Sequence, residues 1–238
     1  MSYKVESRWL AFGIHLSISL VVLIALLSLI FFVWFPHDLI FAGGIDGLKI
    51  LMGVDLILGP LLTLIVYKHG KKGLVFDLSL IALLQFACLF AGTWLVFNER
   101  PLVQLLADDG VHLLAASDFK QYQIELADLP GSYPKHVLLE LPEDLSILGS
   151  VKFNTELVDN KPFTFRDDLY RSIEVIGQQR FEQRIGFIQS SMSDSELARL
   201  DALSTMDCAW VPLISKHNFG YACTNFSQGI IRLSERNF

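Results

Sequence analysis

The chain has 238 residues, of which 52% are hydrophobic and only 18% are charged. Soluble domains carry about 25% charged residues, so this composition excludes a disordered chain and is unusual for a wholly soluble protein. The formal net charge of -6 argues against nucleic acid as a partner, because phosphate binding needs a basic surface. Three cysteines are too few for a small disulfide-rich scaffold. Composition therefore leaves a membrane protein that carries a folded domain.

Three apolar stretches in the first 99 residues are long enough to cross a bilayer, which takes about 20 residues. They cover residues 9–35, 48–67 and 73–97. The first is longer than the apolar part of a secretory signal peptide, which is about 7–15 residues, and it ends in the aromatic run Phe31–Pro36. We therefore predict a transmembrane region over residues 1–99 with three helices, the first of them uncleaved.

The distribution of charge predicts how these helices are oriented. Basic residues lie before the first span and in the turn Lys68–Lys72, whereas residues 36–47 carry acids and no base. The positive-inside rule then places the N-terminus and this turn in the cytoplasm and residues 100–238 in the periplasm of a bacterial inner-membrane protein. Residues 100–238 hold 13 Lys and Arg against 19 Asp and Glu, a balance that suits a protein partner better than anionic lipid.

Residues 100–238 are predicted to form a periplasmic α+β domain with an antiparallel sheet. The sequence Asp108–Gly110 between two apolar runs is a hairpin signal. The expected elements are strands at 102–107 and 111–116, a helix from Ser117 to about Ala127 closed by Pro130-Gly131, a strand at 136–141, a long amphipathic helix from about Phe165 to Met192, a helix at 193–206, and strands at 209–215, 221–226 and 230–233.

Polar residues inside the predicted spans are informative because an Asp at mid-bilayer costs about 2.5–3.5 kcal/mol and usually faces a partner or a cavity. Asp55 lies in the second span, and Gly59 and Thr63 follow it at intervals of four residues, which places all three on one helix face. If the second and third spans form a hairpin about the turn at Lys68–Lys72, Gln85 lies level with Asp55 and can reach it.

A second polar pair is expected closer to the ends of the spans. In the same hairpin, Asp77 of the third span lies at a depth similar to that of His15 in the first, so these side chains can contact each other. Three interpretations of the polar residues remain open. They hold the three helices together, Asp55 faces a groove that receives another helix, or they form an ion or proton path.

The cysteines allow one disulfide in the predicted outer domain. Cys208 and Cys223 both belong to it, and an oxidising compartment permits a bond between them. A turn at Lys216–Phe219 would place Cys208 opposite Ser227 and leave the two cysteines offset, so the bond remains an open question. The absence of a C-x-x-C motif weighs against a thiol oxidoreductase.

No pattern in the sequence indicates catalysis, a metal or a cofactor. The six histidines lack metal-ligand spacing, and the phosphate-loop, dinucleotide-binding and nucleophile-elbow motifs are absent. Adjacent acids such as Asp108-Asp109 are expected at the solvated surface. We therefore expect no catalytic residues, no metal site, no cofactor and no enzymatic activity.

Residues 42–101 carry an ordered set of short motifs. They comprise Asp46 near the start, Val54-Asp55 leading to Gly59-Pro60 and Thr63, the basic turn that ends at Lys71, Asp77-Leu78, Gln85 in the third span, and Arg100-Pro101 after it. In this order they resemble the type IV pilin accessory proteins of the TfpX/TfpZ type, also called FimB. The resemblance implies an inner-membrane protein with a periplasmic domain that supports surface display of a cognate major pilin and has no known catalytic activity.

The sequence is therefore interpreted as an accessory protein or chaperone for a type IV pilin, with membrane lipid and other pilus-machinery subunits as further partners. A pilin waiting in the membrane is a single helix with a head outside, so its partner needs both a bilayer surface and an outer surface. Asp55, Gly59, Thr63 and Gln85 are hypothesised to line the pilin-binding groove. The alternatives are a membrane-anchored sensor whose periplasmic domain binds a ligand, and a small membrane redox enzyme that uses Cys208 and Cys223.

Overall fold

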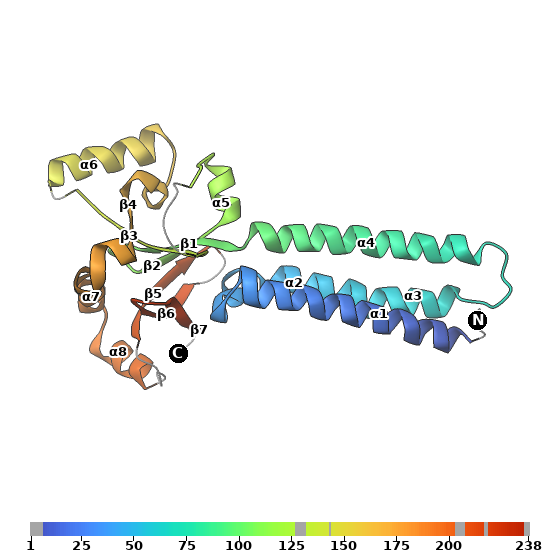
Figure 1. The fold of residues 1–238 in the computed structure, drawn as a ribbon. Helices are drawn as coiled ribbons and strands as arrows, with labels where there is room; N and C mark the ends of the chain where they lie inside the picture. The colour runs from blue at the N-terminus through green and yellow to red at the C-terminus, as the bar shows by residue number, and fades with distance from the viewer. Residues whose placement is uncertain (1–6, 127–131, 143, 203–207, 217–218, 236–238) are drawn as a thin grey trace. The chain divides into compact units, whose positions relative to one another are not determined.

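The computed structural model describes residues 7–126, 132–142, 144–202, 208–216 and 219–235, and Figure 1 shows the order of its elements. The chain divides into two compact units. The helix unit contains the described residues up to Pro36 together with Gly44–Asn98. The sheet unit contains His37–Gly43 and the described residues from Glu99 onward. The second unit is thus assembled from two separate segments of the chain.

The helix unit consists of three stretches that are long and apolar enough to cross a membrane. They cover Arg8–Trp34, Gly47–Val66 and Leu74–Asn98, each within one residue of the predicted span at either end. The first stretch consists of α1 (Arg8–Leu29) and a π-helical turn (Ile30–Trp34). The second consists of α2 (Ile45–Met52), a π-helical turn (Gly53–Leu58) and α3 (Gly59–Val66). The third is α4 (Leu74–Asn98).

The π-helical turn in the second stretch ends two residues before Pro60. Because Pro60 has no N–H, it cannot donate to the carbonyl four residues earlier, and the regular hydrogen-bond ladder is interrupted. The N–H of Gly59 instead donates to the carbonyl of Val54, five residues back. Such single π-turns inside α-helices occur frequently at functional sites. Asp55 lies within this turn.

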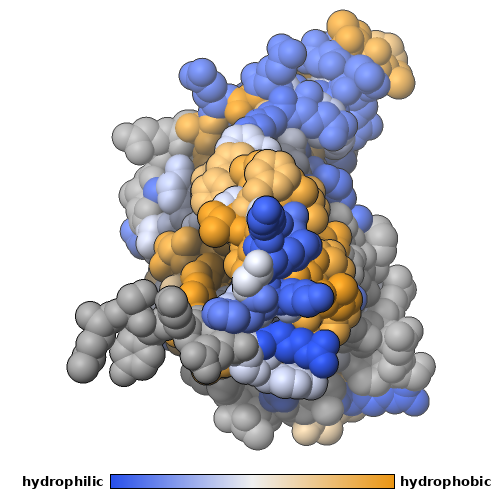
Figure 2. All heavy atoms as spheres, turned by 90° about the vertical axis from the view of Figure 1, so that its right-hand side faces the viewer, coloured by the Kyte–Doolittle hydropathy of each residue, from blue (hydrophilic) through white to orange (hydrophobic). Residues whose placement is uncertain are grey.

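Aromatic residues mark both ends of the helix unit. Trp34 and Phe97 pack edge to face with 5.0 Å between ring centroids at one end, and Trp9 lies at the start of α1. Large apolar side chains along the helices are exposed, for example Ile65 at 71% and Val75 at 79%. Figure 2 looks onto the end of this unit where α1 begins and where α3 turns into α4, and hydrophilic side chains there stand in front of a hydrophobic surface. This distribution is typical of helices that face lipid between two aromatic belts.

The sheet unit is built on one seven-stranded sheet with the order β4-β3-β1-β2-β5-β6-β7. Its strands are β1 (Pro101–Leu106), β2 (Val111–Ala115), β3 (Lys135–Leu139), β4 (Tyr170–Ser172), β5 (Ala209–Ser215), β6 (Phe219–Asn225) and β7 (Gly229–Glu235). The sheet is mixed, because β1 pairs with β3 and β2 pairs with β5 in parallel. The predicted antiparallel sheet is therefore wrong in this respect, since hairpin signals report only strands that follow each other directly.

Four α-helices accompany the sheet in the part of the chain that the structure describes. They are α5 (Ala116–Gln121), α6 (Leu145–Phe153), α7 (Ile173–Ser190) and α8 (Asp194–Asp201). The helix predicted from Phe165 begins only at Ile173, because Phe165 lies in a 3-10 turn and β4 intervenes. The proposed stop at Pro130-Gly131 and the end of the helix predicted over 193–206 lie outside the described residues.

The first segment of the sheet unit, His37–Ala42, forms a 3-10 helix that packs against the edge strand β7. The N–H of Leu233 in β7 donates to Oδ2 of Asp38 over 3.4 Å. The main core of the unit lies elsewhere, where buried side chains such as Val103, Leu105 and Phe119 pack together. The segment between the first two apolar helices therefore completes an edge of the sheet.

A polar cluster between the three apolar helices

Asp55 is buried inside the helix unit, with 5% of its surface exposed. It lies in the π-helical turn of the second apolar stretch. Its carboxylate interacts electrostatically with His15 of α1, but within the described part of the chain it has no hydrogen bond and no ion pair. A buried carboxyl group without such a partner is costly, and a hydrogen-bond donor brought near it would stabilise it.

Thr63 and His15 connect α3 with α1. Nδ1 of His15 and Oγ1 of Thr63 lie 2.6 Å apart, and Thr63 is 3% exposed. The hydroxyl group can donate or accept, so this hydrogen bond forms with either neutral tautomer of the imidazole. A bond between polar side chains on two apolar helices holds the helices together where lipid offers no alternative partner.

Gly59 and Gln85 connect α3 with α4. A Cβ atom at Gly59 would overlap the side-chain amide of Gln85, so only glycine accommodates this amide as placed. Gln85 therefore reaches the second apolar helix, as the hairpin geometry predicts, but its amide lies against Gly59, four residues after Asp55. Small residues at such a position allow two helices to approach closely.

Asp77 belongs to a separate contact at the turn between α3 and α4. Its carboxylate accepts a hydrogen bond from Nζ of Lys71 over 2.6 Å, and both side chains are partly exposed. Because His15 hydrogen-bonds Thr63 instead, the structure does not bring together the pair His15 and Asp77 expected from sequence. The reason is local: Asp77 lies in the first turn of α4, where the preceding basic turn can supply a cation.

The other residues that carry the sequence resemblance lie outside this cluster. Pro60 is buried at the start of α3, and Pro101 begins β1, where it pairs with Ala115. The carbonyl of Arg100 accepts the N–H of Ala116 over 3.0 Å. The side chain of Asp46 lies outside the described part of the structure.

Cys208 and Cys223 form a disulfide in the sheet unit, with their Cα atoms 5.5 Å apart. The expected offset between them followed from a turn placed one residue too late. In the structure Trp210 pairs with Cys223 and Ala209 with Thr224, so Cys208 lies diagonally across from Cys223 on the same face of the two strands. Diagonal neighbours of this kind are close enough for a bond.

Among the residues that the structure describes, no group of three or more His, Cys, Asp or Glu side chains could hold a metal ion. The polar cluster contains a carboxylate, an imidazole, a hydroxyl and an amide on three different apolar helices. Such an arrangement can fix the helices to one another and offer a buried acceptor to an incoming donor. Of the interpretations left open by the sequence, the contacts of His15 with Thr63 and of Gln85 with Gly59 fit the first, and the buried Asp55 without a hydrogen bond among the described residues fits the second.

These observations define a class of protein: three apolar helices that are joined by internal polar contacts and a separate unit with a mixed sheet. No protein-family model matches the chain, and no solved structure matches it. The chain is similar to fimbrial assembly proteins of Dichelobacter nodosus. It is 34% identical over 110 residues to the protein of serogroups C1 and C2, which covers 44% of this chain and 83% of that relative.

Two longer relatives match over a larger stretch of this chain. The fimbrial assembly proteins of serogroups E1 and I are 35% and 34% identical over 127 residues, which is 52% of this chain. The chain spans about half the length of these two relatives, 47% in each case. Together with the coverage of the shorter relative, this similarity shows that the chain belongs to the family of fimbrial assembly proteins.

Proposed function

We propose that this protein is an inner-membrane accessory protein of a type IV pilus and that it binds the pilin subunit before assembly. The observation that carries the proposal is the membership in the fimbrial assembly family of a chain with three apolar helices. Its finer assignment to the TfpX/TfpZ-type accessory proteins is supported by the ordered motifs from Asp46 to Pro101. The N-terminus is proposed to be cytoplasmic and the sheet unit periplasmic, according to the positive-inside rule.

In this proposal the helix unit recognises the membrane-spanning helix of the pilin, and Asp55 is the central acceptor. The carboxylate is buried and has no hydrogen-bond donor among the described residues, so a donor on the pilin helix would supply the missing partner. Gly59, Thr63 and Gln85 hold the helices around it through the contacts described above. Membrane lipid covers the exposed apolar side chains of the same unit.

The test is purification of the tagged protein from its native membranes in mild detergent, followed by mass spectrometry of the proteins that accompany it. We expect the major pilin to co-purify with the wild-type chain. Changing Asp55→Asn or Asp55→Leu removes a hydrogen bond to a charged acceptor, so we expect the amount of pilin to fall by about tenfold or more. Surface piliation should fall in parallel.

The control variant is Asp77→Asn, because Asp77 is another aspartate of the helix unit but is partly exposed and pairs with Lys71. It should retain pilin at the wild-type level, since an exposed ion pair contributes little. Thermal unfolding of each purified variant separates loss of pilin from collapse of the helix unit. Absence of pilin from the wild-type sample would overturn the proposed function, and wild-type levels with both Asp55 variants would overturn the role of this residue.

A further inference from the structure

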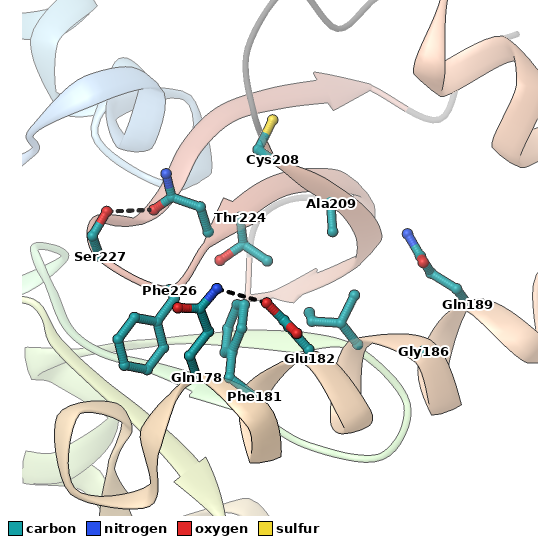
Figure 3. A pocket seen from close by; sticks show the side chains of 12 residues that line it. Gln178, Phe181, Glu182, Gly186, Gln189, Cys208, Ala209, Thr224, Phe226 and Ser227 are labelled. Carbon is teal, nitrogen blue, oxygen red and sulfur yellow. Dashed lines mark hydrogen bonds between the residues drawn. The ribbon is translucent and has the colours of Figure 1, made fainter.

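The sheet unit contains a pocket of about 490 Å³ that has no counterpart in the pilus role proposed above. It lies between α7 on one side and the adjacent ends of β5 and β6 on the other, and all twelve lining residues belong to the sheet unit. Figure 3 shows these side chains converging on the space between the helix and the strands. None of the twelve is Lys, Arg or His, and the single charged side chain is that of Glu182.

Two aromatic rings form part of the pocket wall. Phe181, which is 4% exposed, and Phe226 pack edge to face with 5.9 Å between ring centroids. On its other side Phe181 packs in the same manner against His136, with 5.8 Å between centroids, so its ring is held from two directions. The faces of aromatic rings carry negative electrostatic potential and attract cations within about 6 Å.

Thr224 supplies a buried hydroxyl group that lacks a partner. It is 1% exposed, it lines the pocket, and its Oγ1 has no hydrogen bond within the described residues. A buried polar atom without a partner costs about 1–3 kcal/mol, and native structures rarely retain one without a reason. In Figure 3 the side chain of Thr224 on β6 faces Gln178 and Glu182 of α7.

The remaining polar groups of the pocket include oxygen acceptors. Nε2 of Gln178 donates to Oε1 of Glu182 over 2.7 Å, and Nε2 of Gln189 donates to the carbonyl of Trp210 over 3.0 Å. Each bond uses one of the two N–H donors of its amide, and the amide oxygens of both glutamines have no donor among the described residues. The pocket therefore combines a carboxylate, neutral oxygen acceptors and aromatic faces.

The arginines that flank Glu182 on α7 do not neutralise it. Arg180 pairs with Glu140 through a hydrogen bond of 3.1 Å, and Arg184 pairs with Asp108. No described cation forms an ion pair with Glu182, so its negative charge is available to a ligand. An anionic ligand would meet a carboxylate and no positive side chain, and an apolar ligand would leave the hydroxyl of Thr224 unpaired.

From these groups we infer that the pocket binds a cationic organic group, an ammonium or guanidinium carried on an aliphatic chain. An ammonium offers three N–H donors and a guanidinium offers five, which match the oxygen acceptors around the pocket. The aliphatic chain would lie against Phe181 and Phe226, and the charge would face Glu182. This inference is independent of the proposed pilus role, because every residue that it uses belongs to the sheet unit.

The test is isothermal titration of the full-length protein in detergent micelles with N-acetyl-arginine amide and N-acetyl-lysine amide. N-acetyl-norleucine amide, which has the aliphatic chain without the charge, is the reference compound. We expect both cationic compounds to bind and the neutral one to give no heat. Putrescine distinguishes the source of the ligand: binding equal to that of the blocked amino acids indicates a free amine, and weaker binding indicates a side chain of a polypeptide.

Two variants test the residues that carry the inference. Glu182→Gln should weaken cation binding by about two- to fivefold, the range for an exposed charge pair, and Thr224→Val should weaken it by about fivefold through loss of one hydrogen bond. Glu174→Gln on the same helix lies outside the pocket and should leave binding unchanged. The inference is overturned if neither cation binds, if the norleucine compound binds equally well, or if both pocket variants bind like the wild type.

Discussion

His136 is a single residue whose environment makes the stability of the sheet unit depend on pH. It lies on β3, and its ring packs edge to face against Phe181 of α7. Burial lowers the pKa of His136 from 6.5 to about 4, because the imidazolium would lose its hydration there. In the unfolded chain the same residue keeps its ordinary pKa. The folded protein therefore carries this histidine in its neutral form throughout the physiological pH range.

As the pH falls below 6.5, the imidazole of His136 becomes protonated in the unfolded state, whereas in the folded state it stays neutral until about pH 4. Protonation of His136 therefore does not lower the free energy of unfolding above pH 6.5. Between pH 6.5 and pH 4 it shifts the unfolding equilibrium toward the unfolded state by up to about tenfold per pH unit. We expect His136→Gln to reduce this dependence in thermal unfolding followed over that pH range. His69→Gln, at an exposed position, should retain it, and an identical pH profile for all three proteins would contradict the prediction.

Between elements, close packing of the second and third apolar stretches depends on glycines. A Cβ at Gly59 would overlap Gln85, and one at Gly47 would lie 2.6 Å from Cγ2 of Val96. A Cβ at Gly92 of α4 would likewise lie 2.9 Å from the side chain of Leu51, so the α2–α3 stretch and α4 approach each other at three levels where larger side chains cannot fit as the neighbours stand. This arrangement agrees with the use of small residues at helix interfaces in membranes.

We predict that Gly59→Ala lowers the stability of the helix unit by about 1 kcal/mol, the low end for overpacking, because the added methyl group must displace the Gln85 amide, which is the far end of a flexible side chain. The double variant Gly59→Ala with Gln85→Ala removes the overlap and should recover part of the lost thermal stability in detergent, which is a coupling that a double-mutant cycle measures. Gly13→Ala on α1, where a Cβ meets no atom within 4 Å, should have little effect. Strictly additive single-variant effects would rule out the proposed overlap.

The elements that the sequence predicts well are those defined by local patterns. The three apolar stretches need only length and composition, and the hairpin between β1 and β2 needs only the Asp-Gly turn. The start of α7 was predicted too early because Phe165 continues the helical spacing although it lies in a 3-10 turn before β4. Helix α6 gave no clear pattern, since several of its apolar side chains, such as Ile147, are exposed.

In the polar cluster, too, the sequence predicts the features that depend on local pattern and misses those that depend on how the helices pack. Burial of Asp55 and the reach of Gln85 across the hairpin follow from an acid in an apolar span and a short turn, so both could be predicted. The bond from His15 to Thr63 could not, because it depends on how α1 rotates against α3, which the sequence pattern does not determine. The pocket beside α7 likewise depends on strand register and on the position of the helix above the sheet.

At the scale of the whole molecule, the sheet unit does not begin where the apolar helices end. Residues 37–43, which connect the first and second apolar stretches, belong to it together with Glu99 and the described residues beyond. The chain therefore passes between the two units three times, after Pro36, after Gly43 and after Asn98. A sequence boundary at residues 99 and 100 omits this short segment, because seven residues between two apolar runs have the pattern of an ordinary loop.

The segment covers the edge strand β7, and an uncovered edge strand presents unpaired N–H and C=O groups that favour association with other chains. We predict that Asp38→Ala in the full-length protein removes the acceptor of the Leu233 N–H, so hydrogen exchange of this amide should become about fivefold faster, the effect of one net hydrogen bond of about 1 kcal/mol. Amides of β6 that pair with β5 should keep their protection. Asp144→Ala, which removes the cap of α6 in the same unit, should accelerate exchange in α6 and leave β7 unchanged. Unchanged protection of Leu233 in the Asp38 variant would show that the edge of the sheet is held without this contact.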